Sequence, residues 1–113
     1  MRAFAARFLF ILPLFSGAAH ANPGWTFCVA ETGGGKDIWI TGVFPAVHDR
    51  ERLEADLKAY LKGRGISGAI AQCPVPKEDK VEMVTSQFTA AEFHQKLGDT
   101  LHDVITPEFD PRR

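Results

Sequence analysis

The sequence contains little cysteine and has no excess of either charge. Two cysteines in 113 residues are too few for a zinc site of four thiolates or for a dense disulfide scaffold. The 13 Lys+Arg nearly balance the 14 Asp+Glu, so the chain lacks the basic surface that nucleic-acid-binding proteins present. Together, these features exclude cysteine-rich domains and nucleic-acid partners, and the length predicts a single domain.

Long apolar runs are also scarce, apart from one at the N-terminus. Arg2 and Arg7 precede a run of large apolar residues at 8–15. Mostly small residues follow this run up to Ala21, and Asn22 comes next. A basic start, a short apolar run and an A-x-A ending are typical of a secretory signal peptide cleaved between those two residues. A membrane-spanning helix needs about 20 apolar residues, which is more than this run provides.

Cleavage of residues 1–21 changes the charge of the remaining chain. It removes two arginines and no acidic residue, so the formal net charge falls from −1 to −3. We expect residues 22–113 to be secreted or periplasmic, with no membrane association after cleavage. A domain of this size buries only about 60–65% of its unfolded surface and needs additional stabilisation.

Cys28 and Cys73 can supply that stabilisation. In an oxidising compartment, an even pair in a small secreted domain predicts one structural disulfide. A loop of 45 residues between the two corresponds to roughly 4 kcal/mol in the chain-entropy model. A redox-active pair is the alternative, but such cysteines usually lie two residues apart at the start of a helix.

The first half of the mature chain predicts a β-hairpin. Residues 25–30 and 38–44 are rich in β-branched and aromatic side chains, and the segment 31–37 between them contains three consecutive glycines. These glycines do not form a phosphate-binding loop, because Asp37 stands where the P-loop motif needs a serine or threonine.

The second half predicts two helices and two strands. Asp49 is the expected N-cap of a helix in which Leu53, Leu57 and Leu61 recur at helical spacing. Gly63 and Gly65 are expected to end this helix. Short strands are expected at 66–72 and 100–106, and a loose tail at about 107–113. The segment 77–97 has a helical pattern in which Val81, Val84, Phe88 and Ala91 form one apolar face. It forms either one helix or two helices broken near Thr89, where a capping-box pattern begins.

The order of these elements, ββαβαβ, predicts an α+β fold. We expect an antiparallel or mixed sheet of three to four strands, with both helices on one face and the Cys28–Cys73 disulfide between neighbouring strands.

This arrangement resembles small secreted bacterial α+β domains of uncharacterised function. The resemblance is carried by a strand that contains Cys28, by Val43-Phe44 and by Gln72-Cys73, and it extends over most of residues 25–105. Such domains often end their last strand in a tryptophan, whereas this chain continues to Thr106-Pro107. The resemblance implies the fold and export, but neither an activity nor a catalytic residue.

The candidate catalytic or metal-binding residues are scattered. His48 precedes the first predicted helix, while His94 and His102 lie near Asp99 and Asp103. A hydrolase or metal-dependent enzyme would require His94, His102 and one of these carboxylates to converge. Without such convergence, we expect no cofactor, no bound metal and no catalytic residue.

The tryptophans suggest a different function. Both predicted hairpin strands carry apolar residues on each face, so two helices packed on one face would leave the other uncovered. Trp25 and Trp39 are candidate residues of a contact surface on that open face. The sequence thus predicts an exported, disulfide-linked binding protein without catalysis, whose partner is a protein or a second copy of the chain.

Overall fold

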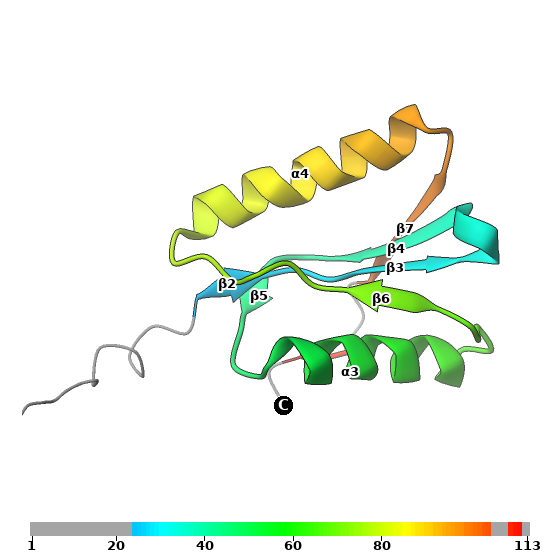
Figure 1. Ribbon diagram of the computed structural model, residues 1–113, viewed down its shortest axis with the longest axis horizontal. Coiled ribbons are helices and arrows are strands. Elements are labelled where there is room, and N and C mark those ends of the chain that lie inside the picture. Colours follow the sequence, from blue (N-terminus) through cyan, green and yellow to red (C-terminus); the bar gives the residue numbers. More distant parts are fainter. Residues whose placement is uncertain (1–23, 105–108, 112–113) are drawn as a thin grey trace, which may run out of the picture.

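The computed structural model describes residues 24–104 and 109–111 (Figure 1). The predicted signal peptide, its cleavage site between Ala21 and Asn22, and most of the predicted loose tail at 107–113 lie outside these residues. No helix within the described part of the chain is both long enough and apolar enough to cross a membrane.

The main sheet has four strands in the order β6-β3-β4-β7. The central strands β3 (Val29–Thr32) and β4 (Asp37–Thr41) form the predicted antiparallel hairpin. At the edges, β6 (Ile70–Gln72) pairs antiparallel with β3, and β7 (Thr100–Val104) pairs parallel with β4. The α+β class is therefore as predicted, and the mixed sheet has four strands.

The predicted strands 25–30 and 38–44 are each interrupted. Their outer parts form a separate two-stranded sheet of β2 (Trp25–Thr26) and β5 (Phe44–Pro45). At the interruption, the Cys28 amide donates to the Thr41 side-chain hydroxyl at 2.9 Å. Because a side chain accepts this hydrogen bond in place of a main-chain carbonyl, the regular ladder ends there. This second sheet is an addition to the predicted topology.

The connection between β3 and β4 is a short 3₁₀ turn, η2 (Gly33–Gly35). Gly34 has a φ of 71°, a left-handed conformation that glycine adopts without the steric cost of a Cβ. The glycine run is thus a hairpin connection between two strands, as its sequence predicts.

Helix α3 (Arg50–Gly63) matches its prediction closely. The Asp49 side chain accepts a hydrogen bond from the Arg52 amide at 2.8 Å and so satisfies one of the free amides of the first turn. Leu53, Leu57 and Leu61 are fully buried, as expected for the apolar face of a helix packed on a sheet.

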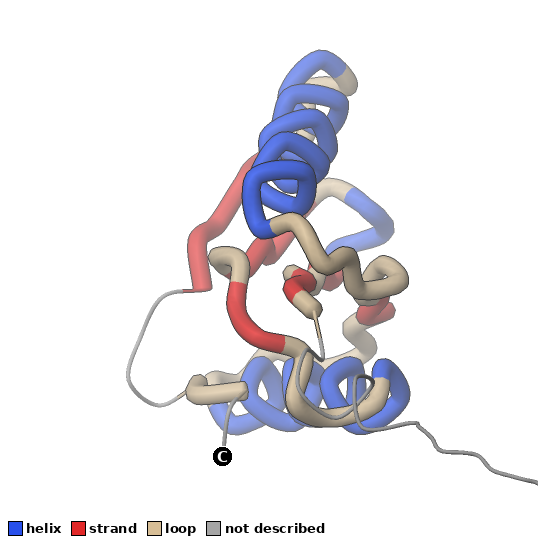
Figure 2. The backbone as a smooth tube through the Cα atoms, turned by 90° about the vertical axis from the view of Figure 1, so that its left-hand side faces the viewer, coloured by secondary structure: helices blue, strands red, loops and turns tan. Residues whose placement is uncertain are grey.

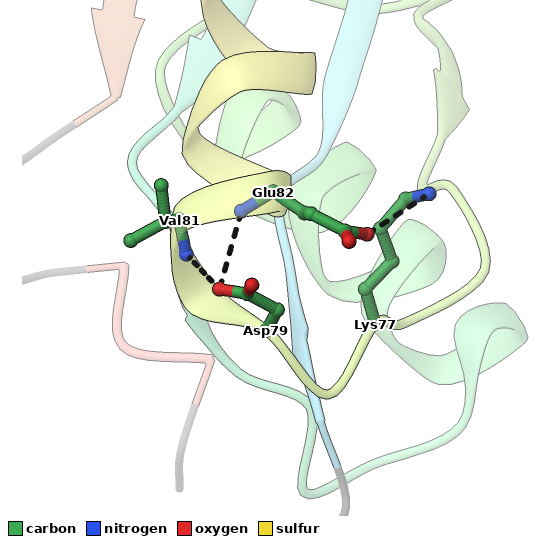
Figure 3. Close-up of polar contacts among 4 residues, drawn as sticks. All are labelled: Lys77, Asp79, Val81 and Glu82. Atoms are coloured by element: carbon green, nitrogen blue, oxygen red, sulfur yellow. Dashed lines mark hydrogen bonds and ion pairs between the residues drawn. The ribbon is translucent and has the colours of Figure 1, made fainter.

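Helix α4 (Lys80–Lys96) is one continuous helix. Asp79 caps its start, because one carboxylate oxygen accepts hydrogen bonds from the amides of Val81 and Glu82 at 2.8 and 3.4 Å (Figure 3). Beside this cap, the Lys77 ammonium lies 3.9 Å from the Glu82 carboxylate. Thr89 does not break the helix, and its hydroxyl donates to the Thr85 carbonyl one turn earlier.

The helices α3 and α4 lie on opposite faces of the main sheet (Figure 2), so the prediction that both cover one face is wrong. The reason is strand alternation. Ala30 and Trp39 pack with the leucines of α3, whereas Val29 and Ile40 pack with Met83 of α4. Because both faces carry apolar side chains, each requires its own cover.

Each helix covers only part of its face. Helix α3 packs against the edge strand β6, while α4 packs against the opposite edge strand β7 and against β2. The two covers are therefore staggered across the sheet (Figures 1 and 2). On the α4 side, the half of the sheet formed by β3 and β6 remains open.

The predicted disulfide between Cys28 and Cys73 is present, and both residues are buried. It links the chain just before β3 to the chain just after β6, with 4.2 Å between the two Cα atoms. The bond thereby attaches the short edge strand β6 to the centre of the sheet.

Replacing both cysteines (Cys28→Ala, Cys73→Ala) is expected to destabilise the domain by roughly 4 kcal/mol, the loop-closure entropy of this long loop. Urea unfolding followed by tryptophan fluorescence measures the loss. The exposed Ser67→Ala variant serves as control and should change stability by less than about 0.5 kcal/mol. An equal effect of the two changes would contradict a structural role for the bond.

Only part of the predicted apolar face of α4 is its packed face. Within Lys80–Lys96, Met83 alone is buried, and the predicted Val81 and Phe88 are 72% and 68% exposed. Ala90 and Ala91 complete the sheet contact. Small residues let the helix lie close to the sheet, so the bulkier side chains project from the opposite side.

We therefore expect Met83→Ala to cost about 2–5 kcal/mol, as for other buried methionines. Phe88→Ala should cost less than about 0.5 kcal/mol, because an exposed side chain loses little packing. Urea unfolding of the two variants distinguishes these packing modes. The reverse order of stabilities would show that Phe88 provides the packing.

Candidate functional site

A groove of about 640 Å³ lies on the open half of the sheet, between α4 and the edge strand β6. We call it the β6 groove. Its floor and walls come from β3, β6, the first turns of α3 and the second half of α4. Its lining comprises Phe27, Val29, Glu31, Arg50, Glu54, Ile70, Ala71, Gln72, Cys73, Pro74, Ala90 and His94.

The groove exists because α4 packs on β7, at the opposite edge of the sheet from β6. In addition, Ala90, which lines the groove from α4, has a small side chain. No helix within residues 24–104 covers Ile70, which is 64% exposed, and Val75 just beyond β6 is equally exposed. A groove that combines polar and apolar lining with exposed apolar side chains beside it is typical of binding surfaces.

The main chain of Cys73 is held from outside the sheet by α3. The Arg50 Nε donates to the Cys73 carbonyl at 2.9 Å, and the Cys73 amide donates to Glu54 Oε2 at 3.0 Å. These two side chains satisfy the amide and carbonyl that a neighbouring strand would otherwise pair with. The sheet edge is therefore closed at Cys73.

The same edge is open two residues earlier. Neighbouring residues of an antiparallel pair point their amide and carbonyl groups alternately toward the partner strand and away from it. Because the groups of Cys73 point outward to Arg50 and Glu54, those of Ala71 also point outward, away from β3. No strand in the described chain lies beyond β6.

His94 lies in the groove wall and forms a pair with Asp99. The ring Nδ1 is 2.9 Å from Asp99 Oδ2, and both side chains are largely buried, with exposures of 16% and 12%. This contact turns Nδ1 toward the carboxylate and leaves Nε2 on the opposite side of the ring. This is the arrangement of a ring held by a carboxylate.

Glu31 contributes a carboxylate to the groove floor. Its side chain is exposed and has neither a hydrogen bond nor an ion pair with any residue that the structure describes. A carboxylate of this kind is available to a cationic group of a ligand.

His102 belongs to a different site on the α3 side of the sheet. Its Nε2 lies 3.0 Å from Asp37 Oδ1, and its ring stacks on Trp39 with 4.1 Å between the centroids. The indole nitrogen of Trp39 in turn donates to the Thr32 hydroxyl at 3.0 Å. These side chains form a polar and aromatic row that fills the surface beside α3.

The structure does not bring His94 and His102 together, because they lie on opposite faces of the sheet. Each has its own aspartate, and Asp103 is exposed on β7. Among the described residues, no group of three or more His, Cys, Asp or Glu side chains is placed to hold a metal ion.

The remaining predicted residues have local roles. His48 is half-buried just before α3. Trp25 packs on the α4 side of the core, with the Lys80 ammonium 4.7 Å above its ring. Trp39 is packed, stacked and hydrogen-bonded, so neither tryptophan lies bare on an open sheet face.

Sequence reasoning missed the groove because its residues are far apart in the chain. Glu54 lies one turn before Lys58, a spacing that pairs opposite charges along a helix surface. In the structure, Glu54 instead binds the main chain of Cys73. The signal that could have revealed the groove was Ile70, a large apolar residue in a strand too short to bury it.

Glu54→Ala is expected to destabilise the domain by about 1–2 kcal/mol, because it leaves the Cys73 amide without its partner. Lys58→Ala is the matched control and should cost less than about 0.5 kcal/mol. Urea unfolding measures both. If the helical charge pair were the source of the effect, the two variants would lose equal stability.

Comparison with known proteins yields no family model, curated protein or solved structure that matches the chain. The resemblance to small secreted bacterial domains therefore stays a prediction. The function has to be argued from the groove itself.

Proposed function

We propose that this protein is an exported binding protein without catalytic activity and that the β6 groove is its contact surface. The observation that carries the proposal is the open half of the sheet face, which combines a groove of about 640 Å³ with the exposed side chains of Ile70 and Val75. A partner that covers this face would remove apolar surface from water, the usual driving force of association.

Export is supported by two independent features. The N-terminal residues have the pattern of a secretory signal peptide, and the Cys28–Cys73 bond is of the kind that persists in oxidising compartments. The proposed location is the periplasm or the extracellular space.

The contact surface is placed at the groove rather than at the tryptophans for an energetic reason. Trp39 already has a stacking partner, a hydrogen bond and core contacts. A partner that bound to Trp39 would therefore compete with these existing interactions. Ile70 has no such cover, and contact with a partner would bury it at little cost.

One observation favours a second candidate, a small hydrolase. The His94–Asp99 pair lines the same groove, and a histidine oriented by a carboxylate can act as a general base. The described groove lining contains no serine or threonine, and its one cysteine, Cys73, is bonded to Cys28, so His94 would have to activate water directly.

A photo-crosslinking residue at position 70 tests the binding proposal. The full chain carrying Ile70→p-benzoylphenylalanine is expressed in its native host and irradiated, and the matched control carries the same residue at Val81, an exposed site on the outer side of α4. We expect a discrete adduct from position 70 and none from position 81. Equal adducts, or no adduct from either site, would contradict the proposed surface.

The His94→Gln variant separates the two candidates. A binding protein should keep its position-70 adduct in this background, because glutamine preserves much of the volume of the groove wall. A hydrolase should lose all turnover of its ester or peptide substrate. Cleavage that disappears in this variant while the fold is retained would replace the binding proposal with the enzymatic one.

A further inference from the structure

We propose that the β6 groove takes an extended peptide segment that carries a basic side chain and that this segment adds to the outer edge of β6 as a fifth strand. The inference rests on the proposed binding function and specifies the partner. Strand addition of this kind derives its affinity from main-chain hydrogen bonds and its selectivity from alternate side chains.

The main chain of β6 provides the first match. The amide and carbonyl of Ala71 point away from β3, and no strand of the described chain pairs with them. A peptide in extended conformation would supply one donor and one acceptor at this position. Ala71 itself lines the groove, so the edge is accessible where the groups are free.

Arg50 and Glu54 determine where the added strand stops. They already bind the carbonyl and amide of Cys73, at 2.9 and 3.0 Å. A peptide cannot pair with Cys73 without displacing both side chains. The added strand therefore pairs at Ala71 and continues in the direction of Ile70, away from the disulfide.

Side chains on the α4 side of the sheet provide the second match. Ile70 and Glu31 are directly opposite each other in the β3–β6 pair, so a peptide residue beside Ile70 would lie two strand spacings, or about 10 Å, from Glu31. Lysine and arginine are long enough to cross Ile70 with their alkyl chains and to reach the carboxylate. Shorter or acidic residues are not suited to this position.

The charge of Glu31 favours a cationic peptide over a neutral one. This carboxylate has no partner within the described chain, and the predicted mature chain carries a formal net charge of −3. Both features favour a basic ligand. Val29 and Ala90 beside it would contact the flanking apolar side chains of the peptide.

Fluorescence anisotropy of the full chain with short dye-labelled peptides tests the proposal. The probe is a capped peptide of alternating threonine and valine with one central lysine, and a second peptide has norleucine in place of the lysine. We expect the lysine peptide to bind about five to ten times more tightly. Glu31→Gln should remove this difference, while Glu78→Gln, an exposed residue outside the groove, should preserve it.

Backbone methylation of the peptide tests strand addition without altering the protein. Two isomers of the lysine peptide are methylated on alternate amides, one at odd and one at even positions. A strand bonded along one edge should lose at least about tenfold in affinity with one isomer and nothing with the other. Equal affinities for both isomers would overturn strand addition.

A protein variant provides an independent readout. Ala71→Pro removes the outward amide of β6 but no bond to β3 and should abolish peptide binding, whereas Ala71→Val keeps the amide and should bind. The unfolding midpoint of each variant shows whether it is folded. A dimer that Ala71→Pro dissociates, with no peptide bound, would assign the edge to a second copy and overturn the peptide proposal.

The peptide result and the crosslinking result can fail separately. Loss of peptide binding together with a persistent adduct from position 70 would retain the binding function and reject the extended cationic ligand. Absence of both would reject both proposals. Peptide binding that is unaffected by the lysine, by Glu31→Gln and by methylation would show non-specific adsorption and overturn the inference.

Discussion

The structure depends on a sheet that is apolar on both faces in a chain that provides one helix for each. Alternation in β3 and β4 sends Ala30 and Trp39 to one side and Val29 and Ile40 to the other. A single helix is narrower than four strands, since strands are spaced about 4.8 Å apart and a helix is about 10 Å wide. One helix therefore covers only part of each face. The staggered placement of α3 and α4 follows from this incomplete covering.

The incomplete covering of the sheet has a chemical consequence at the edge strand β6. Strand β6 has only three residues, and the chain just after it is attached by the disulfide and by the side chains of Arg50 and Glu54. These attachments hold an otherwise weak edge in a fixed position beside the open half of the sheet. The result is a groove with exposed apolar and acidic side chains, and this is the surface proposed for binding.

Local signals predicted much of the fold. The Asp49 cap, the spacing of Leu53, Leu57 and Leu61, and the Cys28–Cys73 pair all act over short range or through a unique pairing, and the structure confirms each of them. The predicted apolar face of α4 was wrong in part, because Val81 and Phe88 follow helical spacing but remain exposed, whereas Ala91 packs on the sheet. Periodicity shows that a helix has an apolar stripe, but not which of its surfaces meets the sheet.

The sequence by itself determined the α+β class, the helix that Asp49 caps and the disulfide, because these depend on neighbouring residues and on the chemistry of two cysteines. Tertiary structure alone decided that the helices lie on opposite faces, that His94 and His102 are separated and that Glu31, Ile70 and His94 line one groove. These residues lie tens of positions apart, and their contacts arise from how sheet and helices pack. The candidate site is thus a property of packing rather than of any local motif.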